Sequence, residues 1–293
     1  MAICLVEYKL NEEKIVLKQL NCPNSTVDLS SPQVMGILNV TPDSFSDGGK
    51  FAHFDHALDQ VERMIAAGAT IIDIGGESTR PGAKDVSEKD ELERVIPVLK
   101  AIKQKFDVVV SIDTSKASVM KAAIESGADI INDVRALQNE GCLAVLANSD
   151  VPICLMHMQG LPRTMQNEPT YSNVVDDIIL FFKQRINACV DAGIAKERLI
   201  LDPGFGFGKT LAQNFHLLAN LSAFEKLDCP ILAGISRKSM IGNLLNRDVE
   251  QRLAGSLSTA IVAVQQGAKI IRVHDVEETV DAIKILKAVA DNQ

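Results

Sequence analysis

Short apolar runs alternate with helix-like segments eight times from Val34 onward, and this alternation constrains the fold more than any other feature. Each run is short and ends at a polar or glycine-rich stretch, which is typical of a strand buried on both faces. The predicted strands are 34–40, 70–74, 108–112, 129–131, 152–157, 199–202, 231–235 and 270–274. The predicted helices are 55–67, 87–105, 115–126, 143–147, 174–192, 210–221, 249–265 and 276–290.

Eight strand–helix units in a chain of 293 residues predict an α/β fold, a (β/α)8 TIM barrel, for which about 250 residues are typical. A doubly wound sheet is the competing architecture. It usually has fewer strands, and its dinucleotide-binding form carries G-x-G-x-x-G after the first strand, which this chain lacks. Residues 34–293 are therefore expected to form the barrel.

Residues 1–33 differ in pattern from the rest of the chain. Two short β-like stretches, 14–18 and 25–29, flank a turn at 22–24. A two-stranded hairpin is marginal unless it packs on another surface. We therefore expect an N-terminal extension whose small hairpin caps the barrel.

The composition excludes several classes of partner. A net charge of −8, a pI near 5.2 and the absence of Trp argue against nucleic-acid binding. No apolar run approaches the roughly 20 residues of a membrane helix, and the start of the chain does not have the pattern of a signal peptide. Six cysteines without a C-x-x-C pair predict reduced thiols in a cytoplasmic protein.

Polar residues stand at or just after the end of every predicted strand. In chain order they are Asn39, Asp73, Asp113, Asn132, Asp133, His157, Asp202, Ser236, Arg237, Lys238, Arg272 and His274. In a closed barrel the carboxyl ends of the strands converge on the face where barrel enzymes carry their chemistry. Any one of these side chains is explained as well by a satisfied buried polar group, but a full ring of eight ends is not.

The ring divides by chemistry. Asp113, Asn132 and Asp202 suit the N–H and C=O edge of a heterocycle. Lys238, Arg272 and His274 lie on the last two strands, where barrels commonly hold phosphate. The sequence thus predicts one pocket with a nitrogen-heterocycle side and an anion side.

Two familiar motifs are excluded. Gly208-Lys209-Thr210 looks like the end of a P-loop, but Pro203 stands where that motif needs its first glycine. No H-E-x-x-H or other compact transition-metal cluster is present in the sequence. A Mg²⁺ ion held partly by the phosphates of a substrate is compatible with these residues.

The motifs at the strand ends resemble, in order, those of bacterial dihydropteroate synthases. Residues 35–49 are similar to the first signature of that family, and residues 72–82 to the second. The later matches are 111–114, 131–133, 155–158, 202–209, 236–239 and 272–274. The resemblance runs from about residue 28 to the C-terminus.

The resemblance implies a transferase of folate biosynthesis. It would condense 6-hydroxymethyl-7,8-dihydropterin diphosphate with p-aminobenzoate to give 7,8-dihydropteroate and pyrophosphate. It further implies a homodimer and a site that sulfonamide analogues of p-aminobenzoate target.

The family also implies which residues act. The pterin and its diphosphate would be bound by Asn39, Thr79, Asp113, Asn132, Asp202, Lys238, Arg272, Val273 and His274. Of these, Asp113, Lys238, Arg272 and His274 would be catalytic, and Asn39 would bind Mg²⁺. The p-aminobenzoate site would comprise Phe45, Thr79, Arg80, Pro81, Phe207, Lys238 and Ser239.

Three alternatives stand beside this interpretation. A pterin-binding barrel of methyltransferase type would read the heterocycle similarly but would not need the residues around a diphosphate. A catalytically inactive barrel serving as a binding module would be expected to lose some of the polar strand ends. A TIM-barrel enzyme with another phosphorylated substrate is compatible with the fold alone.

Overall fold

The computed structural model describes residues 18–41, 50–78, 85–160 and 169–292, apart from the side chains of 50–53. Eight parallel strands form one sheet, which confirms the predicted barrel. They are β3 (Gln33–Asn39), β4 (Ile71–Gly75), β5 (Val109–Asp113), β6 (Ile130–Asp133), β7 (Ile153–Met156), β8 (Leu199–Asp202), β9 (Leu232–Ala233) and β10 (Ile270–Val273).

The ring of strands closes between β8 and β9. Strands β3 to β8 lie in chain order, and β10 then pairs with both β3 and β9. A parallel bridge joins Leu201 of β8 to Ile231, just before β9, and Leu201 N donates to Pro230 O at 2.9 Å. Closure leaves the carboxyl ends of all eight strands around one opening.

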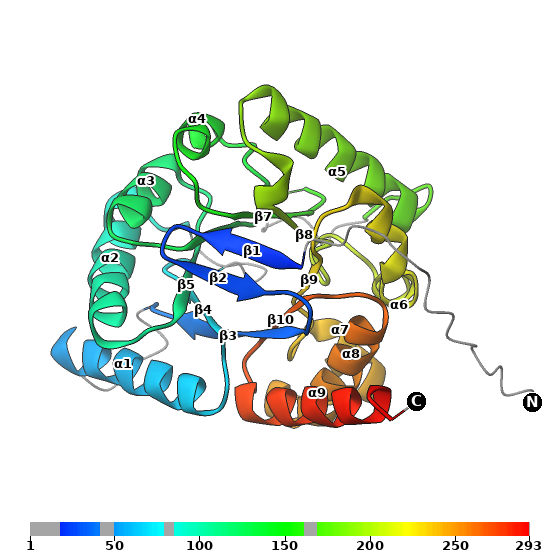
Figure 1. Ribbon diagram of the computed structural model, residues 1–293. Helices are drawn as coiled ribbons and strands as arrows, with labels where there is room; N and C mark the ends of the chain where they lie inside the picture. The colour runs from blue at the N-terminus through cyan, green and yellow to red at the C-terminus, as the bar shows by residue number, and fades with distance from the viewer. Residues whose placement is uncertain (1–17, 42–49, 79–84, 161–168, 293) are drawn as a thin grey trace, which may run out of the picture.

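Helices surround this barrel (Figure 1). They are α1 (Lys50–Ala66), α2 (Glu88–Lys105), α3 (Ala117–Glu125), α4 (Cys142–Ala147), α5 (Val174–Asp191), α6 (Leu211–Ala219), α7 (Ser239–Leu245), α8 (Leu253–Gln265) and α9 (Val276–Ala290). Ser87 caps α2, since its side chain accepts from Asp90 N at 3.1 Å.

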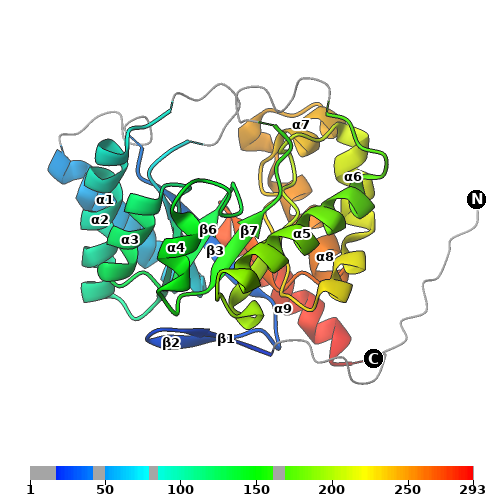
Figure 2. The same ribbon diagram turned by 90° about the horizontal axis from the view of Figure 1, so that it is seen from above.

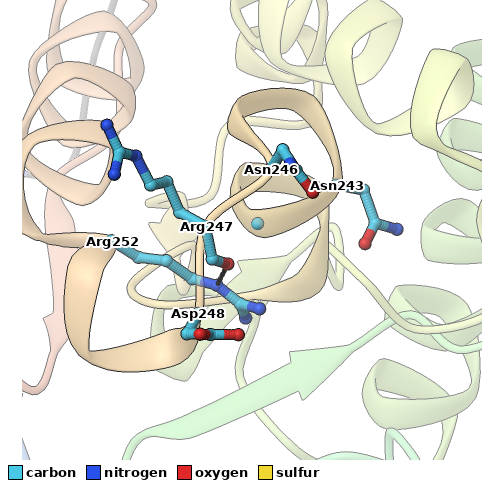
Figure 3. Close-up of a pocket in the computed structure, with 6 residues that line it drawn as sticks. Asn243, Asn246, Arg247, Asp248 and Arg252 are labelled. Atoms are coloured by element: carbon cyan, nitrogen blue, oxygen red, sulfur yellow. Dashed lines mark hydrogen bonds between the residues drawn. The ribbon is translucent and has the colours of Figure 1, made fainter.

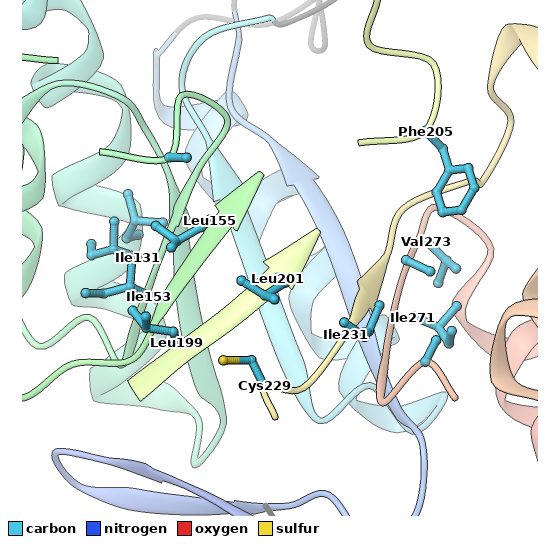
Figure 4. Close-up of a cluster of buried hydrophobic side chains, with 14 of the residues drawn as sticks. Ile131, Ile153, Leu155, Leu199, Leu201, Phe205, Cys229, Ile231, Ile271 and Val273 are labelled. Carbon is cyan, nitrogen blue, oxygen red and sulfur yellow. The ribbon is translucent and has the colours of Figure 1, made fainter. Parts of the chain in front are cut away.

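Every second strand residue points outward and packs against the helices. Figure 4 shows part of this outer core, including Leu155, Leu201 and Val273, and all three are buried. The runs therefore lack polar alternation because both faces of each strand are covered.

The inward-facing residues of the lower barrel form a second, separate apolar cluster. Each strand contributes one side chain to it: Met35, Ile71, Val109, Ile130, Cys154, Ile200, Leu232 and Ile270. Each of these side chains is less than a tenth exposed, so this half of the barrel is filled rather than open. Any ligand must therefore enter from the other end.

A hairpin of β1 (Gln19–Cys22) and β2 (Ser25–Asp28) closes the filled end (Figure 2). Leu20, Val27 and Leu29 join the inner cluster from below, which confirms the expected cap. The strand that the tight turn at Pro23 and Asn24 pairs with β2 is Gln19–Cys22 and not the predicted 14–18. Residues 14–17 lie outside the described part of the chain, and the division at residue 33 stays a prediction.

The structure corrects several other boundaries. The predicted helix at 249–265 is a 3-10 turn, Val249–Gln251, followed by α8. Helix α7 was not predicted, because Gly242 and Asn243 in its middle have low helix propensity. Helix α1 begins five residues before the prediction, and β9 is shorter than the predicted 231–235.

Candidate active site

A polar layer lies directly above the apolar filling of the barrel. Because side chains alternate along a strand, the residue two positions after each inward apolar residue also faces inward. On five strands that residue is polar: Asp73, Ser111, Asn132, Asp202 and Arg272. The first four are nearly or fully buried, and Arg272 is partly buried.

Arg272 binds two carboxylates across the lumen. Its Nε donates to Asp73 Oδ2 at 2.6 Å, and its Nη2 donates to Asp113 Oδ2 at 2.9 Å. Asp73 Oδ2 also accepts from Asn132 Nδ2 at 3.2 Å. The network therefore joins β4, β5, β6 and β10, and its members converge as the sequence predicted. Asp73 was in the predicted ring but had no assigned role, and the structure places it at the centre.

One guanidinium shared by two carboxylates leaves one of them incompletely compensated. Burial, reinforced by the neighbouring charge of Asp73, raises the pKa of Asp113 to about 7, although Arg272 opposes this rise. The two carboxylates in turn raise the pKa of Arg272, against the effect of burial. Near neutral pH, Asp113 can therefore accept a hydrogen bond as an anion or donate one as an acid.

Asp202 and Lys238 form the second charged group at the opening. Asp202 is held by Gly204 N, which donates to its Oδ1 at 2.8 Å. Burial raises the pKa of Asp202, an effect opposed chiefly by Lys238. The Lys238 ammonium donates to the carbonyl of Phe205 and lies 4.5 Å from the centre of the Phe207 ring. Burial lowers the pKa of Lys238 to about 8.

A left-handed residue turns Lys238 toward this group. Arg237 has φ of +56°, which is unusual for a residue with a side chain. Its N–H donates to Ser256 Oγ and its carbonyl accepts from Arg252 Nη1, both at 2.9 Å. Its side chain pairs with Asp275, with Nε 3.0 Å from the carboxylate. These contacts fix the backbone and side chain of Arg237 on the helix side of the turn. The next residue, Lys238, then faces the barrel opening.

His274 lies at the rim of the opening, next to Ser236. The two side chains are 3.1 Å apart, and His274 N donates to Ser236 Oγ at 3.2 Å. His274 is exposed, whereas Ser236 is buried. Arg272 gives this side of the opening the cationic character that the sequence predicted, and His274 adds an imidazole beside it.

The remaining predicted residues differ in how they can take part. Asn39 ends β3 and is half-buried, and Ser239 begins α7 and is exposed. The Val273 side chain packs in the outer core, so only its backbone is available to a ligand in the barrel. Phe45 and the three residues Thr79, Arg80 and Pro81 lie outside the described part of the chain.

Two predicted strand-end residues point away from the opening. Asp133 follows the inward Asn132, so it faces outward and binds backbone N–H groups of Arg135 and Leu137 at 2.8 and 2.7 Å. His157 follows Met156 and packs edge-on against Phe181, with ring centres 4.9 Å apart. For these two the satisfied structural role is the correct one.

A cavity of about 590 Å³ lies beside α7, lined by Gly242, Asn243, Asn246, Arg247, Asp248 and Arg252 (Figure 3). None of the predicted site residues that the structure describes lines it. Arg252 is committed to backbone carbonyls, at 3.0 Å from Arg247 O and 2.9 Å from Arg237 O. Arg252, in the wall of this cavity, thus supports the turn that carries Lys238. The cavity itself is separate from the barrel opening.

The described residues contain no group of three or more His, Cys, Asp or Glu side chains that could hold a metal ion. Asn39 is an oxygen donor at the rim, of the kind that Mg²⁺ accepts. It fits an ion that takes most of its ligands from a bound diphosphate and water.

Comparison with known proteins agrees with this geometry. A model of the pterin binding enzyme family matches residues 35–274. Dihydropteroate synthase of Haemophilus influenzae is 55% identical over 273 residues, covering 93% of this chain and 99% of that protein. The Escherichia coli K12 enzyme of the same name is 54% identical over 270 residues, covering 92% and 96%.

Solved structures show the same similarity. Yersinia pestis dihydropteroate synthase, solved with a sulfonamide drug complex, has a TM-score of 0.89 and 56% identity, covering 93% of this chain and 99% of that one. The Xanthomonas albilineans enzyme in complex with 7,8-dihydropteroate has a TM-score of 0.85 and 45% identity, with coverage of 93% and 98%.

The fold, the polar layer and the family match define a pterin-binding barrel enzyme. Within that class the chain belongs to the dihydropteroate synthase family, whose members are transferases. This agrees with the function that the sequence motifs implied, and it disfavours the methyltransferase, the inactive barrel and the unrelated phosphate enzyme.

Proposed function

We propose that the open end of the barrel binds 6-hydroxymethyl-7,8-dihydropterin diphosphate and p-aminobenzoate and joins them into 7,8-dihydropteroate, releasing pyrophosphate. The observation that carries the proposal is the polar layer, in which acidic and amide side chains on β4, β5, β6 and β8 face cations on β10 and the turn after β9. The substrate carries the ring N–H donors of a pterin and an anionic diphosphate in one molecule. The acidic and amide side chains suit the ring, and the cations suit the diphosphate.

The pterin ring is bound by Asp113, Asn132, Asp202 and Lys238. Carboxylates accept the ring N–H groups, while the amide and the ammonium donate to its oxygen and nitrogen acceptors. Burial of Asp202 and Asn132 in the lumen supports strong hydrogen bonds, because little water competes there.

The diphosphate is bound on the other side, by Arg272, His274 and the backbone at Val273. Mg²⁺, coordinated by Asn39 together with the diphosphate, would supply further neutralisation of phosphate charge when it is bound. The side chains perform the same task from the protein: Arg272 is positioned by two carboxylates, and His274 lies beside Ser236 at the rim.

The reaction requires separation and capture of charge. The bond between the pterin CH₂ carbon and the diphosphate oxygen breaks, and its electron pair leaves with pyrophosphate. The neutral amine of p-aminobenzoate then forms the new carbon–nitrogen bond and loses a proton. Arg272 and His274 stabilise the departing anion, and the Asp113 carboxylate stabilises the positive charge on the pterin. No strong general base is needed, because an aniline is nucleophilic when neutral.

The p-aminobenzoate site is formed by Phe207, Lys238 and Ser239 at the rim, with Phe45, Thr79, Arg80 and Pro81 from the loops after β3 and β4. Lys238 lies 4.5 Å from the Phe207 ring and interacts electrostatically with Asp202, which supports a contact with both substrates. Its charge suits the carboxylate of the second substrate.

We also propose a cytoplasmic homodimer. Large apolar side chains are exposed on and after α7, among them Leu244 at 58% and Leu245 at 46%, and a second copy of the chain would cover them. No helix in the described part of the chain is both long and apolar enough to cross a membrane. Five cysteines in that part are free thiols, as a reducing compartment would maintain them.

The assay that tests the function mixes the enzyme with the pterin diphosphate, Mg²⁺ and p-aminobenzoate and measures dihydropteroate and pyrophosphate. Both products should form in equal amounts. Arg272→Met should abolish turnover, while Lys287→Met, an exposed lysine on α9, should leave it unchanged. Pyrophosphate release without dihydropteroate would contradict the proposed second substrate.

A further inference from the structure

Lys209 is a buried lysine that the proposed mechanism does not use. It follows the glycine-rich stretch after β8 and is only 3% exposed. Its Nζ lies 2.8 Å from Gly204 O, 3.0 Å from Phe207 O and 3.1 Å from His157 Nδ1. The three partners account for the hydrogen-bonding capacity of one ammonium group. A buried ammonium without such partners would be strongly unfavourable.

The anchors of Lys209 bracket the residues that hold Lys238. Gly204 and Phe207 flank Phe205, whose carbonyl accepts from Lys238, and Phe207 supplies the ring beneath its ammonium. Lys209 therefore binds this loop from the inside of the fold, and Lys238 contacts the same loop from the active-site side.

The loop is pressed against the end of β7, which leaves little alternative placement. A Cβ atom on Gly204 would lie 1.9 Å from His157 O, so only glycine permits this approach. Gly206 N donates to Asn214 Oδ1 at 2.7 Å, and Tyr171 Oη donates to Gly208 O at 2.8 Å. These contacts surround the loop, and the Lys209 side chain donates to two of its carbonyls, those of Gly204 and Phe207.

We propose that Lys209, with His157 as its partner, is a positioning residue that fixes the Gly204–Phe207 loop so that the Phe205 carbonyl and the Phe207 ring orient Lys238. This rests on the proposed role of Lys238 in substrate binding. Burial lowers the pKa of both Lys209 and His157, and the charge of Lys209 lowers that of His157 further. A neutral imidazole is the form that has a lone pair for the ammonium.

The test measures Lys238 directly, without relying on turnover. Reaction of Lys238 with a limiting amount of an acylating reagent, followed by peptide mass spectrometry at increasing pH, gives the pH midpoint of its reactivity. In the wild type we expect this midpoint near 8, the lowered pKa of Lys238. In Lys209→Met the loop loses its anchor and Lys238 becomes more solvated. The midpoint should then rise by about one pH unit or more toward the ordinary lysine value.

Pterin affinity, measured by calorimetry, should fall about five-fold or more in Lys209→Met. Lys209→Arg should restore part of both properties, because it retains the charge. The matched control is Lys103→Met. Lys103 is partly buried, whereas Lys209 is fully buried, and it pairs with the buried Asp129 at 2.7 Å at the filled end of the barrel. It should lose thermal stability and keep the wild-type midpoint and affinity.

If Lys209→Met does not fold, His157→Phe decides the question alone, since it keeps the ring packing and removes the acceptor. The same direction of change is expected, with smaller size. The proposal is overturned if a folded Lys209→Met keeps the wild-type Lys238 midpoint and pterin affinity. If only His157→Phe folds, the same result in that variant overturns it. If the Lys238 midpoint rises in Lys209→Met as expected but the wild type makes no dihydropteroate, the proposed function is contradicted and the positioning role remains.

Discussion

Arg272 and Asp113 are 159 residues apart in the chain, yet Nη2 of the arginine donates to Oδ2 of the aspartate at 2.9 Å. The same arginine binds Asp73 at 2.6 Å, so one cation serves two carboxylates inside the barrel. Burial and this unequal count of charges together raise the pKa of Asp113 to about 7, which provides tests of the pterin site.

The first prediction is that pterin binding releases a proton near neutral pH. The free Asp113 carboxyl has its pKa raised to about 7, and ring N–H groups that donate to it will lower that value. Pterin affinity should therefore increase as pH rises through about 7. Calorimetry in two buffers with different ionisation enthalpies measures the number of protons released.

Asp113→Asn is the control for this titration. It should abolish the linked proton release and weaken binding by roughly 10- to 150-fold, since a hydrogen bond to a charged group contributes about 1.5–3 kcal/mol. Proton release of equal size in the wild type and in Asp113→Asn would show that another group titrates.

The stability of the ligand-free enzyme should carry the same signature. Because the folded-state pKa of Asp113 is raised, its contribution to the free energy of unfolding is fully present below pH 4 and is lost as pH rises to about 7. Denaturant titrations of the wild type and of Asp113→Asn should diverge across this window. The wild type should lose more stability on going from pH 4 to 7, and parallel curves would contradict the raised pKa.

Lys238 should set the alkaline limit of activity. Its pKa is lowered to about 8, so the cation is lost above that pH. We expect kcat/KM for p-aminobenzoate to fall above pH 8 in the wild type. In Lys238→Arg this limb should disappear, because arginine stays charged, although the absolute rate will be lower. An identical limb in both enzymes would assign it to a different group.

Mg²⁺ and Asn39 should act together on the diphosphate. Removal of the metal with EDTA should stop turnover, and added Mg²⁺ should restore it. Asn39→Ala should raise the Mg²⁺ concentration needed for half-maximal rate, because it removes the oxygen ligand that we propose for the ion. Ser239→Ala, at the rim after β9, should leave that concentration unchanged. Full activity in EDTA would exclude the proposed metal role.

The barrel and the ring of polar strand ends could be predicted because both arise from local sequence. Apolar runs such as that of β3 are short, and glycine or proline interrupts the chain after them. The direction of each polar side chain was harder to predict. Asn132 and Asp133 are adjacent, yet a strand period of two sends one into the lumen and the other outward. Only the exact strand register decides between them.

Contacts between side chains that are far apart in the chain could not be predicted, for a different reason. Lys209 stands in a motif that looks like a P-loop, and nothing local indicates that its ammonium is buried against His157. In the same way the sequence identified Asp73 without its partner. Which of the many acidic strand ends Arg272 would meet depends on how the strands close into a ring.

The last prediction concerns Asp73, the carboxylate that Arg272 and Asn132 share. Asp73→Asn removes a fully buried negative charge next to Asp113, and that charge helps to raise the pKa of Asp113. The variant should therefore shift the proton release on pterin binding to lower pH. It should also lower the free energy of unfolding, by about 1–3 kcal/mol, because Arg272 keeps Asp113 but loses one ionic hydrogen bond. Calorimetry and denaturant titration measure the two effects separately. Asp281→Asn, on the exposed face of α9, is the matched control and should change neither. A loss of stability without any shift of the proton release would mean that Asp73 supports the barrel but does not tune Asp113.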